Sequence, residues 1–134
     1  MADTVEFELV SPQRLVLSEP VEMVVVPGAE GDVGVLPGHS PLICSVRPGV
    51  IDIHEQGSVR ESIFVAGGFA EVSPERCTVL AEEAVPVSEI DQGEAQARLE
   101  AARTAEADAD DEGRPAAEAE RRIAEAMVAA AASA

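Results

Sequence analysis

The amino-acid usage of this 134-residue chain changes abruptly at residue 88, and that change constrains the fold more than any single motif. Before it, short runs rich in Val, Ile and Leu are separated by Gly and Pro, a pattern typical of an all-β sandwich or barrel. After it, alanine dominates, charges recur every few positions and β-branched residues almost vanish, which favours helix. The sequence therefore predicts a β domain over residues 1–87 and a helical domain over residues 88–134.

Seven runs in the first half predict strands. In "VEFELV", Val5, Phe7 and Leu9 alternate with acids, which turns one face toward a core and the other toward water. "VIDIHE" repeats the alternation, with Ile53 and either Val50 or Ile51 facing inward, whereas "VEMVVV" is apolar on both faces and is expected to be a central strand. The predicted strands are 5–10, 14–18, 21–26, 49–55, 58–66, 69–73 and 77–83.

Two helices are expected in the second half, over 89–106 and 115–131, joined by the turn "DADDEGR" into an antiparallel hairpin. Ser88 is the candidate N-cap of the first helix, and Pro115 suits the first position of the second. Pairs of opposite charge four residues apart are expected to support the helices. These pairs are Glu94–Arg98, Glu118–Arg122 and Arg121–Glu125.

The seam between these helices is expected to consist largely of alanine. An alanine buries roughly a third of the apolar area of a leucine, so such a seam holds two helices together only marginally. The hairpin is therefore expected to open or detach readily. The predicted seam residues are Ile90, Ala97, Leu99 and Ala101 on the first helix and Ala119, Ile123, Met127 and Ala130 on the second.

The charge of the chain limits its partners. The sequence has 26 acids against 9 arginines and no lysine, a net charge of −17, with no Trp or Tyr. Such a surface repels nucleic acid and anionic lipid, and it lacks the aromatic platforms on which bases stack. The N-terminal "MADTVEFELV" has no signal-peptide pattern, and no run approaches the ~20 apolar residues of a membrane span, so a soluble protein is expected.

The sequence contains weak candidates for metal and thiol chemistry. Asp108, Asp110, Glu112 and Gly113 match the start of a calcium-binding EF-hand loop, but its later positions hold Pro115 and Ala119. A solvated acidic turn is favoured over a weak divalent site. Two histidines without ligand spacing do not predict zinc. Cys44 and Cys77, both in apolar runs, are interpreted as two buried free thiols, with a disulfide or a reactive thiol as alternatives.

The stretch "EGDVGVLPGHSPL" (30–42) concentrates acids, glycines, prolines and a histidine in one connection. Asp32, His39 and Ser40 are the residue types of a hydrolase triad, but no strained elbow or oxyanion hole accompanies them. The glycine spacing matches no nucleotide-binding loop, and no catalytic residue or cofactor is predicted. The stretch is interpreted as a shaped, exposed loop. A recognition surface and a connection required only by the fold remain open alternatives.

The β half closely resembles the epsilon subunit of F-type ATP synthases, through "EGDVGVLPGHSPL", then "RPGV" and later "GGFAEV" at the spacings seen here. The resemblance implies a β-sandwich of about ten strands, followed by an antiparallel pair of helices. It implies a non-catalytic subunit at the foot of the rotor's central stalk, which couples proton translocation to ATP synthesis. The resemblance also implies that the subunit is a peripheral protein on the cytoplasmic face of the bacterial inner membrane.

The same resemblance implies a contact surface for the gamma subunit and the c-ring. Asp32 falls at the family's acidic c-ring contact, where it would pair with arginine, and His39 lies close to the stalk. In many relatives the helical pair also reaches the alpha/beta head and blocks rotation. The implied contact residues are Glu30, Gly31, Asp32, Val35, Pro37, Gly38 and His39.

The helical half departs from the family pattern in two respects. The ATP-binding motif of some relatives survives in Ile90, Asp91 and Ala95. Glu94 stands in place of its arginine, and Arg98 lies off the motif position. A carboxylate there would repel a phosphate, which disfavours ATP binding. Residues 88–134 also carry 12 acids against 5 arginines, which argues against strong inhibition through an acidic partner segment.

The rival interpretations of the whole chain are a free-standing β-sandwich adaptor and a small hydrolase.

Overall fold

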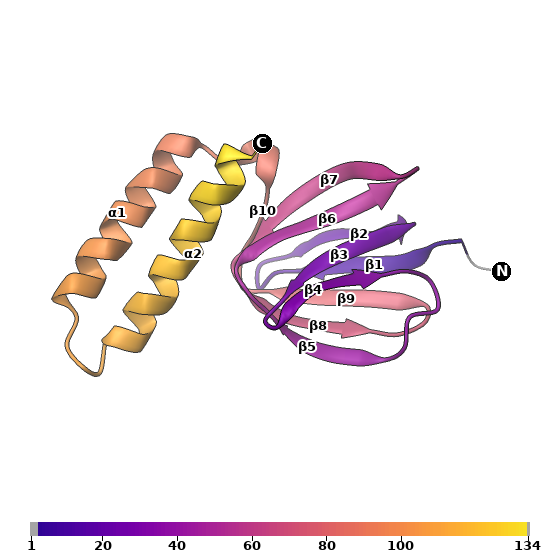
Figure 1. Ribbon diagram of the computed structural model, residues 1–134, viewed down its shortest axis with the longest axis horizontal. Coiled ribbons are helices and arrows are strands. Elements are labelled where there is room, and N and C mark those ends of the chain that lie inside the picture. Colours follow the sequence, from indigo (N-terminus) through magenta and orange to yellow (C-terminus); the bar gives the residue numbers. More distant parts are fainter. Residues whose placement is uncertain (1–2, 134) are drawn as a thin grey trace.

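The computed structural model describes residues 3–133, which form ten strands followed by a short 3₁₀ turn and two helices (Figure 1). The prediction of a β-sandwich with a C-terminal helical hairpin is confirmed. The strands are β1 (Val5–Val10), β2 (Leu15–Val21), β3 (Met23–Gly28), β4 (Gly31–Val35), β5 (Leu42–Val46), β6 (Gly49–Glu55), β7 (Ser58–Val65), β8 (Gly68–Val72), β9 (Arg76–Ala81) and β10 (Ala84–Pro86). The 3₁₀ turn is Val87–Glu89, and the helices are α1 (Gln92–Asp108) and α2 (Arg114–Ala132).

The strands hydrogen-bond in the order β10-β7-β6-β3-β5-β8-β9-β1-β2, while β4 pairs with β3 beside this path. Between β3 and β5 only one residue pair, Gly28 with Val46, is in register. The sheet therefore turns sharply there, and Figure 1 shows β6 and β7 on one side of the sandwich and β5 and β8 on the other. The neighbours β1 and β9 run parallel.

The sandwich core follows the alternation read from the sequence. Val5, Phe7 and Leu9 of β1 have no exposed surface, whereas Glu8 points outward to an ion pair with Arg76 at 2.8 Å. In β6 the inward residues are Ile51 and Ile53 rather than Val50. The period of two thus directs apolar side chains into one continuous core between the layers.

The strand predicted to be central is β3, which pairs with both β4 and β6. Val24 and Val26 are fully buried, while Met23 and Val25 are half-buried. One face therefore belongs to the core, and the other is only partly covered.

The interpretation of residues 30–42 as one loop is wrong for its first part, because residues 31–35 form strand β4. Two residues turn the chain after Gly28, and β4 then pairs antiparallel with β3. Val33 and Val35 lie opposite Val26 and Val24, so their alternation with small residues suits a strand. The glycines of β4 obscure its two-residue alternation in the sequence. The connecting loop therefore covers only residues 36–41.

Helix α1 begins later than predicted. Ile90 is extended, and Asp91 is the N-cap, with its carboxylate accepting a hydrogen bond from the backbone N–H of Glu94 at 2.9 Å. The predicted cap, Ser88, lies in the 3₁₀ turn and makes no capping bond. An aspartate cap satisfies an otherwise unpaired N–H and suits the positive end of the helix dipole.

The seam of the hairpin lies on a different face of α1 from the one predicted. Ala95, Leu99 and Ala102 are buried, at a spacing of four and three residues that keeps them on one side. The predicted Ala97 and Ala101, together with Ala119 on α2, are exposed. The predictions of Leu99, Met127 and Ala130 are confirmed as buried, and the buried residues of α2 are Ala124, Met127, Ala130 and Ala131.

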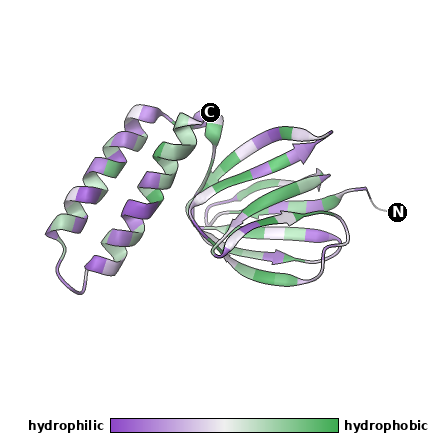
Figure 2. Cartoon of the chain, viewed as in Figure 1, coloured by the Kyte–Doolittle hydropathy of each residue, from purple (hydrophilic) through white to green (hydrophobic). Residues whose placement is uncertain are grey.

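The hairpin packs on the outer face of β6 and β7, and this packing explains the change of face. Phe64 of β7 points away from the sandwich core, opposite to Ile63 and Val65, yet it is fully buried. It lies in a second apolar cluster with Ala95, Met127 and other residues of the hairpin. Figure 2 shows hydrophobic colour running along the strands, whereas both helices are banded with hydrophilic residues.

Candidate functional site

Most of the residues predicted to contact partners lie at the β3–β4 turn and in the loop that follows β4. Glu30 is in the turn, Gly31 and Asp32 begin β4, and all three are exposed. Val35 at the end of β4 is fully buried, so it supports this surface from below instead of offering its side chain to a partner.

Arg47, which follows β5, fixes the turn. One guanidinium nitrogen donates to the Asp32 carboxylate at 2.6 Å and another to the backbone carbonyl of Gly28 at 2.6 Å. The Asp32 side chain still keeps 61% of its accessible surface. A carboxylate held in place while exposed is suited to a second cationic partner, because little side-chain freedom remains to be lost on binding.

The loop 36–41 is tied to the opposite layer. Gly38 has φ 86°, a left-handed conformation that favours glycine, and its N–H donates to the carbonyl of Pro74 at 2.8 Å. His39 donates its backbone N–H to Leu36 at 3.2 Å, and its ring nitrogen Nδ1 lies 2.7 Å from the carbonyl oxygen of Ser40. These bonds give a sequence rich in glycine and proline one defined shape.

The structure does not assemble the hydrolase arrangement. The carboxylate of Asp32 is bound by Arg47, and the ring of His39 meets the backbone of Ser40, not its hydroxyl. A serine nucleophile needs its hydroxyl within hydrogen-bond reach of a base, and neither contact is of that kind.

An exposed apolar row was not predicted from the sequence. Phe69 of β8 lies beside Leu80 of β9, Leu80 beside Val10 of β1, and Val10 beside Leu15 of β2. Phe69, Leu80 and Leu15 keep 59%, 55% and 56% of their surface exposed. The signal was available in "TVLA", where an apolar residue occupies the outward position of an alternating strand, and an exposed row of this kind is a candidate interaction surface.

The residues considered for nucleotide binding are engaged elsewhere. Asp91 caps α1, Ile90 packs against the cluster around Phe64, and Arg98 is bound by two carboxylates. The hydrogen bonds that Arg98 donates to Glu83 first, and then to Glu120, hold the pKa of Arg98 above its ordinary value, while burial opposes them. The three side chains therefore do not converge on a space for a phosphate.

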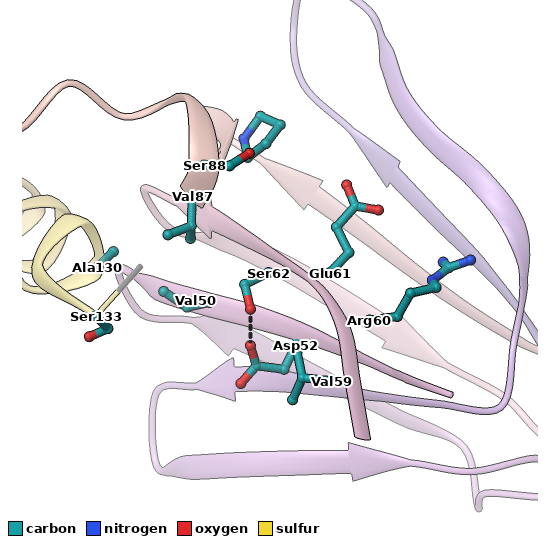
Figure 3. Close-up of a pocket in the computed structure, with 11 residues that line it drawn as sticks. Val50, Asp52, Val59, Arg60, Glu61, Ser62, Val87, Ser88, Ala130 and Ser133 are labelled. Carbon is teal, nitrogen blue, oxygen red and sulfur yellow. Dashed lines mark hydrogen bonds between the residues drawn. The ribbon is translucent and has the colours of Figure 1, made fainter. Parts of the chain in front are cut away.

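A groove of about 640 Å³ lies beside the C-terminal end of α2, over the outer face of β6 and β7 (Figure 3). Asp52 and Ser62, joined by a 2.7 Å hydrogen bond, line it together with Val50 and Val87.

Over residues 3–133, no three His, Cys, Asp or Glu side chains gather as a metal site. Neither helix there is long and apolar enough to cross a membrane.

Both cysteines are free, as the favoured interpretation predicted. Cys77 is buried and Cys44 half-buried. Burial, and to a lesser degree the neighbouring Cys44, raises the pKa of Cys77 to about 12. The thiolate form is therefore suppressed near neutral pH, which makes Cys77 a packing residue.

Comparison with known sequences identifies the family. Residues 4–87 match the family described as the β-sandwich domain of the ATP synthase delta/epsilon chain. The chain belongs to the ATP synthase delta/epsilon family. The ATP synthase epsilon chain of Rhodospirillum rubrum is 56% identical over 132 residues, which is 97% of this chain and 98% of that one. That of Paramagnetospirillum magneticum is 62% identical over 109 residues, covering 81% and 82% of the two chains.

Solved structures of mitochondrial ATP synthases contain chains of similar fold. A chain in the mitochondrial ATP synthase of Euglena gracilis, solved with OSCP, F1 and the c-ring, superposes with a TM-score of 0.83 at 28% identity, over 97% of this chain and 82% of that one. A chain from the central stalk and c-ring of Tetrahymena thermophila mitochondrial ATP synthase gives a TM-score of 0.65 at 12% identity, over 95% and 96%. The second match shows the shared fold alone.

Proposed function

We propose that this chain is the non-catalytic epsilon subunit in the central stalk of an F-type ATP synthase, where it couples proton translocation to ATP synthesis. The observation that carries the proposal is similarity along almost the whole chain to proteins named ATP synthase epsilon chain. The site geometry adds a physical reason, since it offers contact surfaces whose residues are held in place by hydrogen bonds.

The turn and the apolar row suit two different partners. Glu30 and Asp32 present carboxylates at the β3–β4 turn, which fits the basic polar loops of a c-ring. The loop with Pro37, Gly38 and His39 and the apolar row across β8, β9, β1 and β2 fit the gamma subunit, because burying exposed apolar surface stabilises a permanent contact. Such contacts transmit torque only if they are rigid. The hydrogen bonds of Arg47 to Asp32 and Gly28 make the β3–β4 turn rigid.

The hairpin has a weakened regulatory role in this proposal. Twelve acids against five arginines in residues 88–134 oppose capture of the hairpin by an acidic segment of the alpha/beta head. The engaged Arg98 and the carboxylate of Glu94 oppose nucleotide binding. The subunit would be held at the cytoplasmic face of the bacterial inner membrane only through the complex.

Reconstitution tests the proposal. A synthase depleted of its epsilon subunit is supplied with the wild-type chain, Asp32→Arg or Asp111→Arg, and ATP-driven proton pumping is measured. We expect wild type and Asp111→Arg to restore pumping equally, because Asp111 lies in the distant α1–α2 turn. Asp32→Arg should restore it poorly, since it reverses the charge at the turn. If the wild-type chain restores nothing, the rotor proposal is wrong and an adaptor function gains support.

A further inference from the structure

Arg98 joins three separate parts of the molecule. Its guanidinium donates to the Glu83 carboxylate at 2.9 and 3.0 Å, and to the Glu120 carboxylate at 2.8 and 3.4 Å. Glu83 lies between β9 and β10, Arg98 is on α1 and Glu120 is on α2. Over residues 3–133, Arg98–Glu83 is the only ion pair that links the hairpin to the sandwich.

The position of Glu83 is fixed by its own backbone. Its carbonyl accepts a hydrogen bond from the N–H of Ala66 at 3.0 Å, next to the end of β7. The Arg98 side chain retains only 28% of its accessible surface, and its NH1 nitrogen also lies 3.9 Å from the sulfur of Met127. A charge pair with both partners held and partly removed from water is stronger than a mobile surface pair.

The apolar contact between the hairpin and the sandwich is small, so the Arg98–Glu83 ion pair contributes a large part of the stabilisation of the docked hairpin. Phe64 is the largest side chain that the sandwich contributes to the buried cluster, and Val50 packs beside it only partly buried. The helices meet it with Met127, with alanines such as Ala95 and Ala130, and with the partly buried Ile123 and Val128. Apolar stabilisation scales with buried area. Alanine offers little apolar area, so the directional Arg98–Glu83 ion pair adds stabilisation that the apolar contact does not provide.

We propose that Arg98 is a latch that keeps the hairpin docked on the sandwich, because it binds Glu83 of the sandwich and Glu120 of α2 at the same time. Without the arginine, two carboxylates would face each other across the joint between sandwich and hairpin. Their repulsion would then favour release of the hairpin.

Arg121 provides a matched control. It also bridges two carboxylates, Glu106 at 2.8 Å and Glu125, but all three residues lie within the hairpin. Replacing either arginine by glutamine removes one positive charge, and only Arg98→Gln removes the link to the sandwich. Any difference between these variants therefore reports docking, not net charge.

Hydrogen exchange and a methyl signal of the isolated full-length chain test the latch. In Arg98→Gln we expect exchange at the amides of α1 to accelerate about tenfold, relative to Arg121→Gln. The ¹³C-methyl signal of Met127 should move toward that of an exposed methionine in Arg98→Gln alone, with Met23 as the internal reference. Equal behaviour of the two variants would overturn the latch.

A charge exchange separates docking from misfolding. The double variant Glu83→Arg/Arg98→Glu places the cation on the sandwich, between two acids on the helices, and should return the exchange rates to the wild-type range. If it behaves like Arg98→Gln although its strands keep wild-type exchange, the pairing is not what holds the hairpin. Increasing salt should accelerate α1 exchange in wild type more than in Arg98→Gln, and an equal response would also count against the latch.

The consequence in the complex rests on the proposed function. In reconstituted synthase, Arg98→Gln should hydrolyse ATP at about the same rate as Arg121→Gln, because the net negative charge of the hairpin opposes its capture by the head even when the hairpin is undocked. Failure of the wild-type chain to restore pumping would reject the proposed function, and the exchange result on the isolated chain would still decide the latch.

Discussion

At Gly68 the backbone of β8 lies very close to that of β9, its hydrogen-bonded neighbour in the sheet. A Cβ at this position would lie 1.9 Å from the carbonyl oxygen of Leu80, and the φ angle of 142° already disfavours any side chain. The second glycine of the motif "GGFAEV" is therefore required for steric reasons, since β8 has to pair with β9 and β5 at this point.

Gly68→Ala is expected to destabilise the sandwich by about 3 kcal/mol, because clash and backbone strain add. The control is Gly34→Ala, since a Cβ there meets nothing within 4 Å. Urea unfolding followed by circular dichroism measures both variants. If Gly68→Ala lowers the free energy of unfolding by less than the roughly 0.5 kcal/mol typical of surface changes, the two strands move apart to admit the methyl group without a measurable loss of stability, and the steric argument is wrong.

Cys77 should respond to pH and to alkylating reagents through its buried thiol. Its pKa is about 12 in the fold and 9.0 in the unfolded chain. Stability from this site is therefore complete below pH 9 and is lost as the pH rises toward 12, because only the unfolded thiol ionises in that window. We expect iodoacetamide at pH 8 to modify Cys77 only after denaturation, as peptide mass spectrometry would reveal. Cys77→Val should lack the loss of stability above pH 9.

Among the secondary-structure elements, the hairpin depends on one residue of β7. Phe64 faces outward from the strand and is fully buried by the helices. Ile63, its neighbour, is buried in the sandwich core. Adjacent residues of one strand thus stabilise two different parts of the molecule.

Phe64→Ala is expected to undock the hairpin while leaving the sandwich folded, whereas Ile63→Ala should cost the sandwich itself about 2–5 kcal/mol. Hydrogen exchange followed by mass spectrometry distinguishes them. In Phe64→Ala, acceleration should be confined to the peptides of α1 and α2. Uniform acceleration over the strands would mean that hairpin and sandwich form one cooperative unit.

The elements also show how far the sequence predicts this fold. Strands with clear alternation, such as β1 and β6, and the composition change at residue 88 give the architecture, because both depend on local pattern. Strand β4 was missed because its glycines resemble a turn, although its pairing with β3 is regular. The buried face of α1 depends on Phe64, which is distant in sequence, and no helical period could reveal it. Among the candidate site residues, the Asp32–Arg47 pair was unforeseen for the same reason.

On the scale of the whole molecule, strong negative charge and an exposed apolar row occur together. A net charge of −17 keeps copies of this chain apart, so the row can remain exposed without causing self-association. The row lies across β8, β9, β1 and β2, while the hairpin covers the outer face of β6 and β7. Docking of a partner on the row and movement of the hairpin therefore involve separate surfaces.

Phe69→Ser tests the assignment of the row to a partner. Phe69 is 59% exposed, so its loss should change the free energy of unfolding by no more than about 0.5 kcal/mol. A central interface aromatic costs about 2 kcal/mol or more of binding on truncation, and we expect affinity for a purified gamma subunit to fall by at least about tenfold in a calorimetric titration. Val59→Ser, at a side chain that is 48% exposed on β7, should bind as wild type does. If Phe69→Ser also retains full affinity while the chain still binds gamma, the contact lies elsewhere on the sandwich and the row is exposed for another reason.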